Sequence, residues 1–424
     1  LKPMILLLPH PLRGRVGERC LKGYPRRKPG GYLKMLSRRQ PWMSDFSTDW
    51  LALREPADSR ARSTRLVGSL LRRLAVLTQH PGAESSPSPQ TLRILDLGCG
   101  TGANFRYLAP RLGLAPGAGP WVRQDWICVD RDRKLLADLI RRTADWAWGL
   151  NLTTSLHGEG LIIQGVQGVP GEQGVGGVQG DHGERGVPGS QGAQGKIQGF
   201  QGVQGGPAPS THGRVRTRDL DLARGAESLL LGAGTLVVAS ALLDLVSANW
   251  LAGLLRACAR SRSHLYLALT YDGRIDLSPD HPHDGTLVAL VNAHQGRDKG
   301  LGGPALGPSA PACLAELAAG LGFALEAADS DWVLGSDEPE LQAALVAGWA
   351  VAAREQVPQG PESRGVDEAI CRWHEQRQAQ IAAGILQIRV GHRDALLSPR
   401  AAGPAPAPTA TTLSQAAPLR STSM

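Results

Sequence analysis

The chain has 424 residues, 42% of them hydrophobic and 20% charged, which is ordinary for a globular protein with a sizeable core. Its net charge of +8 comes from the first 42 residues, which hold eleven Lys and Arg against one acid. The remaining chain is slightly acidic, which excludes the basic footprint of a nucleic-acid-binding protein. Six scattered cysteines without a CxxC spacing exclude a disulfide framework and a zinc site, and they indicate a reducing, cytoplasmic compartment.

Residues 1–42 are expected to be a disordered basic extension. The apolar run Ile5–Leu8 is too short for a signal-peptide core or a membrane span. A polybasic tail that binds RNA or a membrane surface is the alternative, but basic runs are usually solvated. We therefore expect no nucleic-acid and no membrane partner.

Residues 43–90 are predicted to form a helical cap and a linker. Leucines recur on one face of Arg65–His80, which predicts an amphipathic helix. Trp50–Pro56 predicts a short helix that stops at its proline. Pro81–Gln90 is rich in Pro and Ser and is expected to link this cap to the first strand.

The stretch Arg93–Asn104, RILDLGCGTGAN, is the centre of the predicted fold. An apolar run ends in Asp96 and in three alternate glycines, Gly98, Gly100 and Gly102, which predicts a buried parallel strand, a tight turn and a helix start. Glycines let the backbone approach a ligand closely. The dinucleotide fingerprint is also satisfied, but a carboxylate at the strand end would repel a pyrophosphate and suits a ligand that carries an ammonium and a sulfonium.

The acid and the three glycines fill the pattern acid-x-Gly-x-Gly-x-Gly, and the stretch resembles motif I of the class I S-adenosylmethionine-dependent methyltransferases. The resemblance implies S-adenosylmethionine as the cofactor. It also implies a doubly wound, mostly parallel, seven-stranded Rossmann-like α/β sheet with helices on both faces and an antiparallel last strand. In this family, helices before motif I often cover the substrate, so Arg54, Asp58 and Arg60 would line its entrance; plain surface charge is the alternative.

The first part of the predicted methyltransferase domain covers 91–157. Trp126–Asp130 is predicted to be its second strand, ending in an acid that can accept hydrogen bonds from both hydroxyls of a ribose. Residues 158–209 follow as a collagen-like insertion, in which glycine recurs at every third position from Gly165 to Gly195. Only two prolines fall in these triplets, so we expect a disordered expansion that loops out of the sheet; a trimerising stalk is the alternative.

The second part of the domain is expected over 210–398, followed by a disordered tail over 399–424. Its predicted strands are Val215–Leu222, Thr235–Ala241, His264–Thr270, Phe323–Leu334 and Ile385–Val390, the last two paired antiparallel. Ser247 is expected to cap one helix and Ser309 another. The fifth strand would deliver 271–274 at its carboxyl end.

Ligands of open α/β sheets lie beyond the carboxyl ends of the strands, which defines the candidate site. The predicted cofactor-binding residues are Asp96, Gly98, Cys99, Gly100, Thr101, Gly102, Asp130, Asp221 and Ser240. The resemblance implies that Asp221 faces the adenine, with Asp219 as the alternative. Asp244, Tyr271 and His294 are the candidate catalytic residues, and a base is needed only if the nucleophile must lose a proton.

Residues 281–284 and 292–299 are expected to form a polar loop after the fifth strand. We expect no metal site there, because loop histidines without a second matching cluster are usually solvated.

The sequence thus predicts a methyltransferase that acts on a small molecule, as a monomer or dimer, or as a trimer if the insertion assembles. One alternative is a non-catalytic, collagen-like trimeric interaction protein. Another is an NAD-dependent oxidoreductase that uses the same glycine turn.

Overall fold

The computed structural model describes residues 47–77, 91–114, 123–158, 160–165, 211–225, 229, 231–358 and 363–400. The predicted basic extension, the linker over 78–90, most of the Gly-X-Y insertion and nearly all of the tail lie outside these residues. None of the helices in the described ranges is long and apolar enough to cross a membrane.

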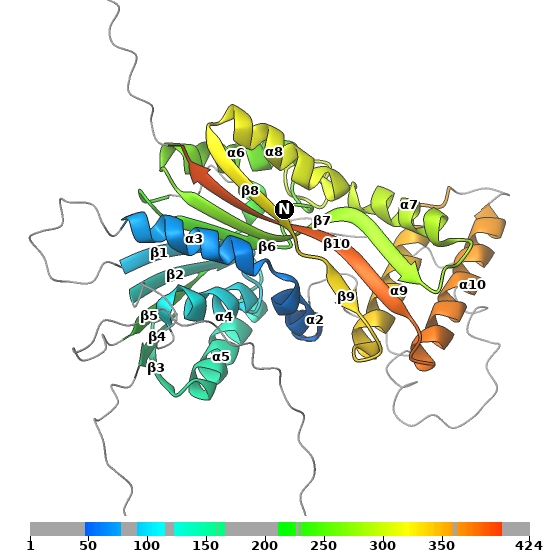
Figure 1. Ribbon diagram of the computed structural model, residues 1–424, viewed down its shortest axis with the longest axis horizontal. Helices are drawn as coiled ribbons and strands as arrows, with labels where there is room; N and C mark the ends of the chain where they lie inside the picture. The colour runs from blue at the N-terminus through cyan, green and yellow to red at the C-terminus, as the bar shows by residue number, and fades with distance from the viewer. Residues whose placement is uncertain are drawn as a thin grey trace, which may run out of the picture.

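Ten strands in the described ranges form one sheet (Figure 1). Its centre is parallel and has the order β5 (His212–Asp219), β2 (Arg123–Asp130), β1 (Thr91–Leu97), β6 (Leu236–Ser240) and β7 (His264–Ser278). Beyond β7, the strand β10 (Gln387–Pro399) pairs antiparallel with both β7 and β8 (Phe323–Asp329). This arrangement confirms the predicted doubly wound α/β sheet with an antiparallel last strand.

The described sheet has three strands more than the expected seven, because β3 (Leu152–His157) and β4 (Gly160–Gly165) are added and because the predicted strand Phe323–Leu334 is divided into β8 and β9 (Trp332–Leu334). β9 pairs with β10, and β3 pairs with β4, which in turn pairs antiparallel with β5. We had placed residues 160–165 in the insertion, but Leu161 and Ile163 are buried and add a strand to the sheet. The Gly165 amide donates to the Thr211 carbonyl at 3.1 Å, so the described chain stops at Gly165 and resumes at Thr211 at adjacent positions of the sheet.

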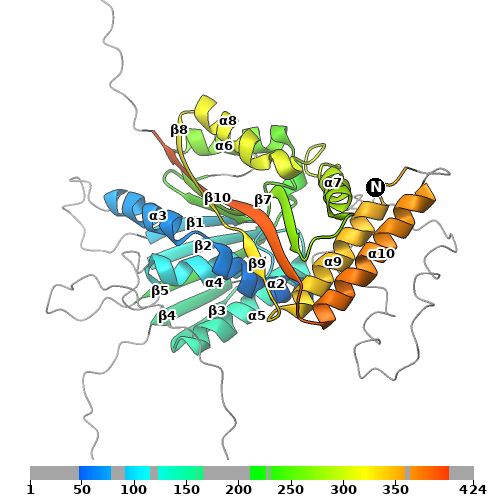
Figure 2. The ribbon, with the colours of Figure 1, turned by 45° about the vertical axis from the view of Figure 1, so that its right-hand side comes forward.

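Helices cover both faces of the sheet (Figures 1 and 2). One face carries α3 (Thr64–Leu77), α4 (Ala103–Ala109) and α5 (Arg133–Gly149), and the other carries α6 (Ala248–Arg260) and α8 (Ala310–Gly320). Trp126 is fully buried on the first face, with its ring edge-on to Phe105 at 5.0 Å. The predicted cap of α6 is confirmed, because the Ser247 hydroxyl accepts from the Trp250 amide. Short helical turns are η2 (Pro110–Leu114), η3 (Leu222–Arg224) and η5 (Gly307–Ser309).

A second lobe is built on β7 and β10, which continue together beyond the carboxyl end of β6. Its own apolar core lies under α7 (Asp284–Gln295), α9 (Pro339–Arg354) and α10 (Ser363–Ala382), and α9 and α10 lie side by side in Figure 2. Two expectations were wrong here. Residues 271–274 lie within β7, which continues to pair with β10 on both sides of them, and five of the twelve residues of the predicted polar loop belong to α7, whose Asp284 is held by Arg377 of α10.

The first described helix, α2 (Thr48–Ala61), does not stop at Pro56 as we had expected. The Pro56 ring is exposed, and the helix continues for a further turn and a half although an internal proline costs about 3 kcal/mol. The turn after Pro56 carries buried Ala57 and Asp58, whose packing under α2 offsets that cost. α2 thereby reaches from the glycine turn to β9.

We predict that replacing residues 166–210 by a four-residue turn preserves the fold and raises its free energy of unfolding by about 2 kcal/mol or less. The ends of the segment are already hydrogen-bonded, and loop closure depends only logarithmically on loop length. Denaturant unfolding followed by circular dichroism measures this change. Light scattering on the same variant reports whether the oligomeric state depends on the segment, and a large loss of stability would contradict the prediction.

Candidate functional site

The glycine turn after β1 lies at the carboxyl edge of the sheet. Gly98, Gly100 and Gly102 have φ of +62°, +52° and +87°, the left-handed region that favours glycine. A Cβ on Gly102 would lie 2.8 Å from Leu139 of α5, and one on Gly100 would lie 3.1 Å from Leu51 of α2. Neighbouring helices therefore close on the turn from two sides, and the predicted strand–turn–helix is confirmed.

Asp96 points inward just before this turn and has no exposed surface. One of its oxygens accepts from the Asn104 side-chain amide at 2.8 Å, and Oδ2 has no hydrogen-bond partner. Burial raises the pKa of Asp96 to about 7, although the Asn104 hydrogen bond and the positive charge of Arg62 act in the opposite direction. The carboxyl is therefore poised to change its charge near neutral pH.

Arg62, just after α2, connects the helical cap to this acid. Its Nη1 donates to Asn104 Oδ1 at 2.6 Å, and its Nη2 donates to the Ser240 hydroxyl at 3.1 Å. Its guanidinium also stands 4.7 Å from the centre of the Tyr107 ring. The predicted cofactor residue Ser240 is thus engaged by an arginine that the sequence did not single out.

Asp130 and Asp221 lie at the ends of β2 and β5, as predicted. Asp130 accepts from the Gly100 amide at 2.9 Å and from the Asp132 amide at 3.0 Å, which offsets part of the rise in its pKa caused by burial. Asp221 caps η3 and accepts from Ala223. The two acids are brought close together, because the Leu220 amide donates to the Asp130 carbonyl at 3.0 Å.

The other two predicted residues of the turn face inward. Cys99 and Thr101 are 6% and 2% exposed, so their side chains pack in the interior. Burial and the neighbouring Cys128 thiol raise the pKa of Cys99, which keeps it protonated and unreactive. If these residues contact a ligand, they do so through their backbone.

Asp244 follows β6 and is 8% exposed. Its Oδ1 has no hydrogen-bond partner, and burial raises its pKa to about 6 against the opposing influence of Arg54 and Lys299. The loop that carries it borders the glycine turn, since a Cβ on Gly98 would lie 3.5 Å from Leu242. The structure thus leaves this candidate with a free acceptor atom beside the turn.

The two other catalytic candidates are hydrogen-bonded elsewhere. The Tyr271 hydroxyl donates to Asn292 Oδ1 at 2.6 Å, and burial raises the pKa of Tyr271 well above its usual value, which disfavours its action as a base. The His294 ring is 3.3 Å from Glu355 at the end of α9. Neither residue has a buried acceptor atom without a partner, as Asp244 has.

Arg54 lies close enough to Asp244 to lower its pKa, and it belongs to a group of four buried side chains from α2, β9 and β10. Arg54 and Asp58 of α2 form a two-point ion pair at 3.0 and 3.1 Å, and the Trp332 indole donates to Asp58. His392 of β10 is 6% exposed, and its ring lies 5.1 Å from Trp332. Arg60, the third predicted entrance residue, is exposed and pairs with Glu338 instead.

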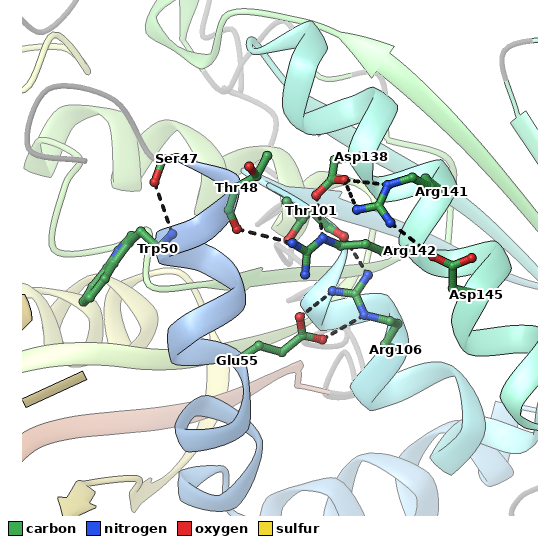
Figure 3. A network of polar contacts seen from close by, with 10 residues as sticks. All are labelled: Ser47, Thr48, Trp50, Glu55, Thr101, Arg106, Asp138, Arg141, Arg142 and Asp145. Carbon is green, nitrogen blue, oxygen red and sulfur yellow. Dashed lines mark hydrogen bonds and ion pairs between the residues drawn. The ribbon is translucent and has the colours of Figure 1, made fainter. Parts of the chain in front are cut away.

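An ion pair and a hydrogen bond hold α2 against α4 and α5 (Figure 3). Arg106 of α4 donates to both oxygens of Glu55 at 2.8 and 2.6 Å, and it also donates to the Thr101 carbonyl within the glycine turn. Arg142 of α5 reaches the Thr48 carbonyl at 3.4 Å. α2 is thus fastened to the same turn that it covers.

No group of three or more His, Cys, Asp or Glu that could hold a metal ion occurs in the described part of the chain.

The solved structures that match this chain are remote from it in sequence. An S-adenosylmethionine-dependent methyltransferase from Geobacter sulfurreducens, solved with S-adenosyl-L-homocysteine, is 13% identical, with 82% of this chain and 98% of that chain covered and a TM-score of 0.33. A putative sarcosine dimethylglycine methyltransferase from Galdieria sulphuraria is 13% identical over 80% and 90%, with a TM-score of 0.30. The cyclopropane synthase MmaA2 from Mycobacterium tuberculosis is 10% identical over 84% and 95%, with a TM-score of 0.32.

No family model matches the chain, and no curated protein matches it by sequence. At this distance the solved structures assign no activity, so the function must be argued from the rim of the sheet itself.

We predict that Glu55→Gln loosens α2 without unfolding the sheet. Losing a partly buried, two-point contact with Arg106 should lower the free energy of local opening of α2 by about 1–2 kcal/mol. Hydrogen exchange of α2 amides, compared with those of β1 and β6, measures this change. Arg141→Ala is the matched control, because that arginine is 62% exposed and its loss should cost about 0.5 kcal/mol or less. Equal effects of the two substitutions would show that the contact between Glu55 and Arg106 does not hold α2 in place.

Proposed function

We propose that the chain is a methyltransferase that uses S-adenosylmethionine and acts on a small molecule. The observation that carries the proposal is the meeting of three acids, from β1, β2 and β5, around one left-handed glycine turn. Asp130 accepts from the Gly100 amide, and Asp221 lies one residue beyond the amide that binds the Asp130 carbonyl. This is the arrangement expected for a nucleoside that carries a positive charge.

The residues at the rim fit such a cofactor. Asp96 Oδ2 is a buried acceptor without a partner, which suits a cation, and the carboxylate of Asp130 stands where ribose hydroxyls could replace the Gly100 amide as donors. Asp221, beside the backbone of η3, would face the base. When bound, S-adenosylmethionine supplies a methyl group already activated by its sulfonium, so the protein mainly aligns the acceptor and excludes water.

The dinucleotide alternative is less well supported. A pyrophosphate over the glycine turn would lie close to Asp96 and Asp130, and two carboxylates there oppose a second pair of negative charges. The trimeric alternative depends on residues 166–210, which lie outside the described ranges.

We predict that Gly100→Val abolishes binding of S-adenosylmethionine, measured by isothermal titration calorimetry. The turn requires a φ of +52° at this position, which a β-branched residue rarely adopts. The valine side chain would also collide with Leu51, beside the place proposed for the cofactor. Gly158→Val is the matched control, with a φ of +58° and open space around it in the β3–β4 turn. The proposed function would be refuted if the wild-type protein bound neither S-adenosylmethionine nor its demethylated product.

We also predict that the affinity for S-adenosylmethionine falls by up to about tenfold per pH unit below pH 7. Asp96, with a pKa of about 7, must lose its proton before it can face a cation, so binding weakens as acid protonates it. Arg62→Met removes a positive charge that lowers this pKa and should move the fall to higher pH. Arg65→Met, on an arginine 60% exposed, should not. If Arg62→Met weakened binding equally at every pH, Arg62 would not act by lowering the pKa of Asp96, and the prediction would be wrong.

A further inference from the structure

Two of the buried polar atoms without a hydrogen-bond partner in the described residues lie on the loop after β6 and on β10. They are Oδ1 of Asp244 and Nδ1 of His392, on side chains of residues that are 8% and 6% exposed. A buried donor or acceptor left unpaired costs about 1–3 kcal/mol. Two such atoms from separate elements, one after β6 and one on β10, indicate a place where a ligand completes the hydrogen bonding.

Several contacts bring the two residues near each other and near the helix that covers the glycine turn. His392 pairs across the sheet with Tyr271, whose backbone amide is hydrogen-bonded to Asp244. Arg54 of α2 is close enough to both Asp244 and His392 to lower the pKa of each. One turn earlier, Leu51 of the same helix stands over Gly100.

The charges around the two atoms disfavour an anionic ligand. Asp244 is largely ionised at neutral pH and can only accept hydrogen bonds. The guanidinium of Arg54 is already engaged at two points by Asp58, so its charge is compensated. A carboxylate or phosphate would therefore meet the negative charge of Asp244, with Lys299 as the nearby cation that already lowers the pKa of that acid. The indoles of Trp332 and Trp50 already accommodate a positive group, the Arg54 guanidinium, at 5.0 and 5.9 Å.

The base strength of the two side chains favours a nitrogen nucleophile over a hydroxyl. Burial raises the pKa of Asp244 to about 6, and burial and the charge of Arg54 lower the pKa of His392 to about 4, against the opposing influence of Asp58, Asp272 and the Val390 carbonyl. Both groups are too weakly basic to take a proton from a phenol, whose pKa is about 10. An amine that arrives as the free base needs no such step, because its lone pair is free to attack. An alkylammonium, whose pKa is about 10 like that of lysine, first loses its proton to solvent and binds as the uncharged amine.

We propose that Asp244 and His392 bind the methyl acceptor and that this acceptor is a small amine. The assignment rests on the proposed function. The amine nitrogen forms a bond to the methyl carbon while the carbon–sulfur bond breaks, and the electron pair of that bond remains on sulfur. The positive charge passes from sulfur to nitrogen, where an N–H group donates to Asp244 Oδ1, and the excess proton then leaves to solvent. His392 accepts a second hydrogen bond from the acceptor. Both side chains are more than nine-tenths buried, so α2 must shift for the acceptor to enter.

The experiment compares matched compounds on the full chain. Benzylamine and butylamine, benzyl alcohol and butanol, and benzoate and butyrate are each incubated with methyl-labelled S-adenosylmethionine, and transfer of the label is counted. Calorimetric titration of benzylamine into the complex with S-adenosylhomocysteine measures binding without turnover. We expect transfer to the amines alone. Asp244→Asn should weaken benzylamine binding by about tenfold or more and His392→Phe by about fivefold, with cofactor affinity within about threefold of wild type.

Asp276→Asn is the control, because that acid is exposed on the same strand as Tyr271. Transfer to the alcohols or acids and not to the amines, transfer to none of the six compounds, or unchanged amine binding by Asp244→Asn would each overturn the assignment. Failure of the wild-type chain to bind the cofactor in calorimetry would instead overturn the proposed function, so the two failures are distinguishable.

Discussion

The burial of Asp96 is the constraint on which the site depends. An ionised carboxylate without solvent is costly, and the protein surrounds this one with a hydrogen bond from Asn104 and, behind it, the charge of Arg62. Because the folded-state pKa is raised, the stabilisation due to the protonated form is present at low pH and is lost as the pH rises toward 7. The folded protein is therefore less stable at neutral pH than at low pH by the cost of ionising Asp96 beside the glycine turn. Arg62 comes from the helical cap, so the cap is part of the site and not an appendage to it.

Much of the sheet could be predicted from the sequence, because its signals are local. Each correct prediction depends on a short pattern whose residues directly determine the local structure. Examples are Asp96 with the three glycines, the acid that ends β2 and the serine that caps α6. The hairpin β3–β4 was missed for the opposite reason. Most of β3 is exposed, and β4 ends where the glycine repeat begins, so neither strand has an apolar alternation that marks it.

The acceptor side of the site could not be predicted in the same way. The sequence predicts a strand that ends before His392, and nothing local marks this histidine. Its position depends on a bulge in β10 and on pairing with Tyr271, which lies more than a hundred positions earlier. α2 has no apolar stripe, because the residues it turns inward include Arg54 and Asp58, which a hydrophobicity pattern assigns to solvent. Buried polar groups are satisfied by partners distant in sequence, so local periodicity does not reveal them.

The hydrogen bond between Gly165 and Thr211 has a consequence for how this chain can vary in length. A segment that leaves and returns at one hydrogen-bonded pair places no geometric demand on the number of residues between them, and each doubling of that number costs only about 0.6 kcal/mol. The glycine repeat advances by three residues, so gain or loss of whole triplets keeps its pattern in phase and leaves β4 and β5 in register. Copies of this protein that differ only in repeat number should therefore share one sheet and one site. The connection between β4 and β5 is therefore a place where the chain can gain or lose triplets without disturbing the described sheet.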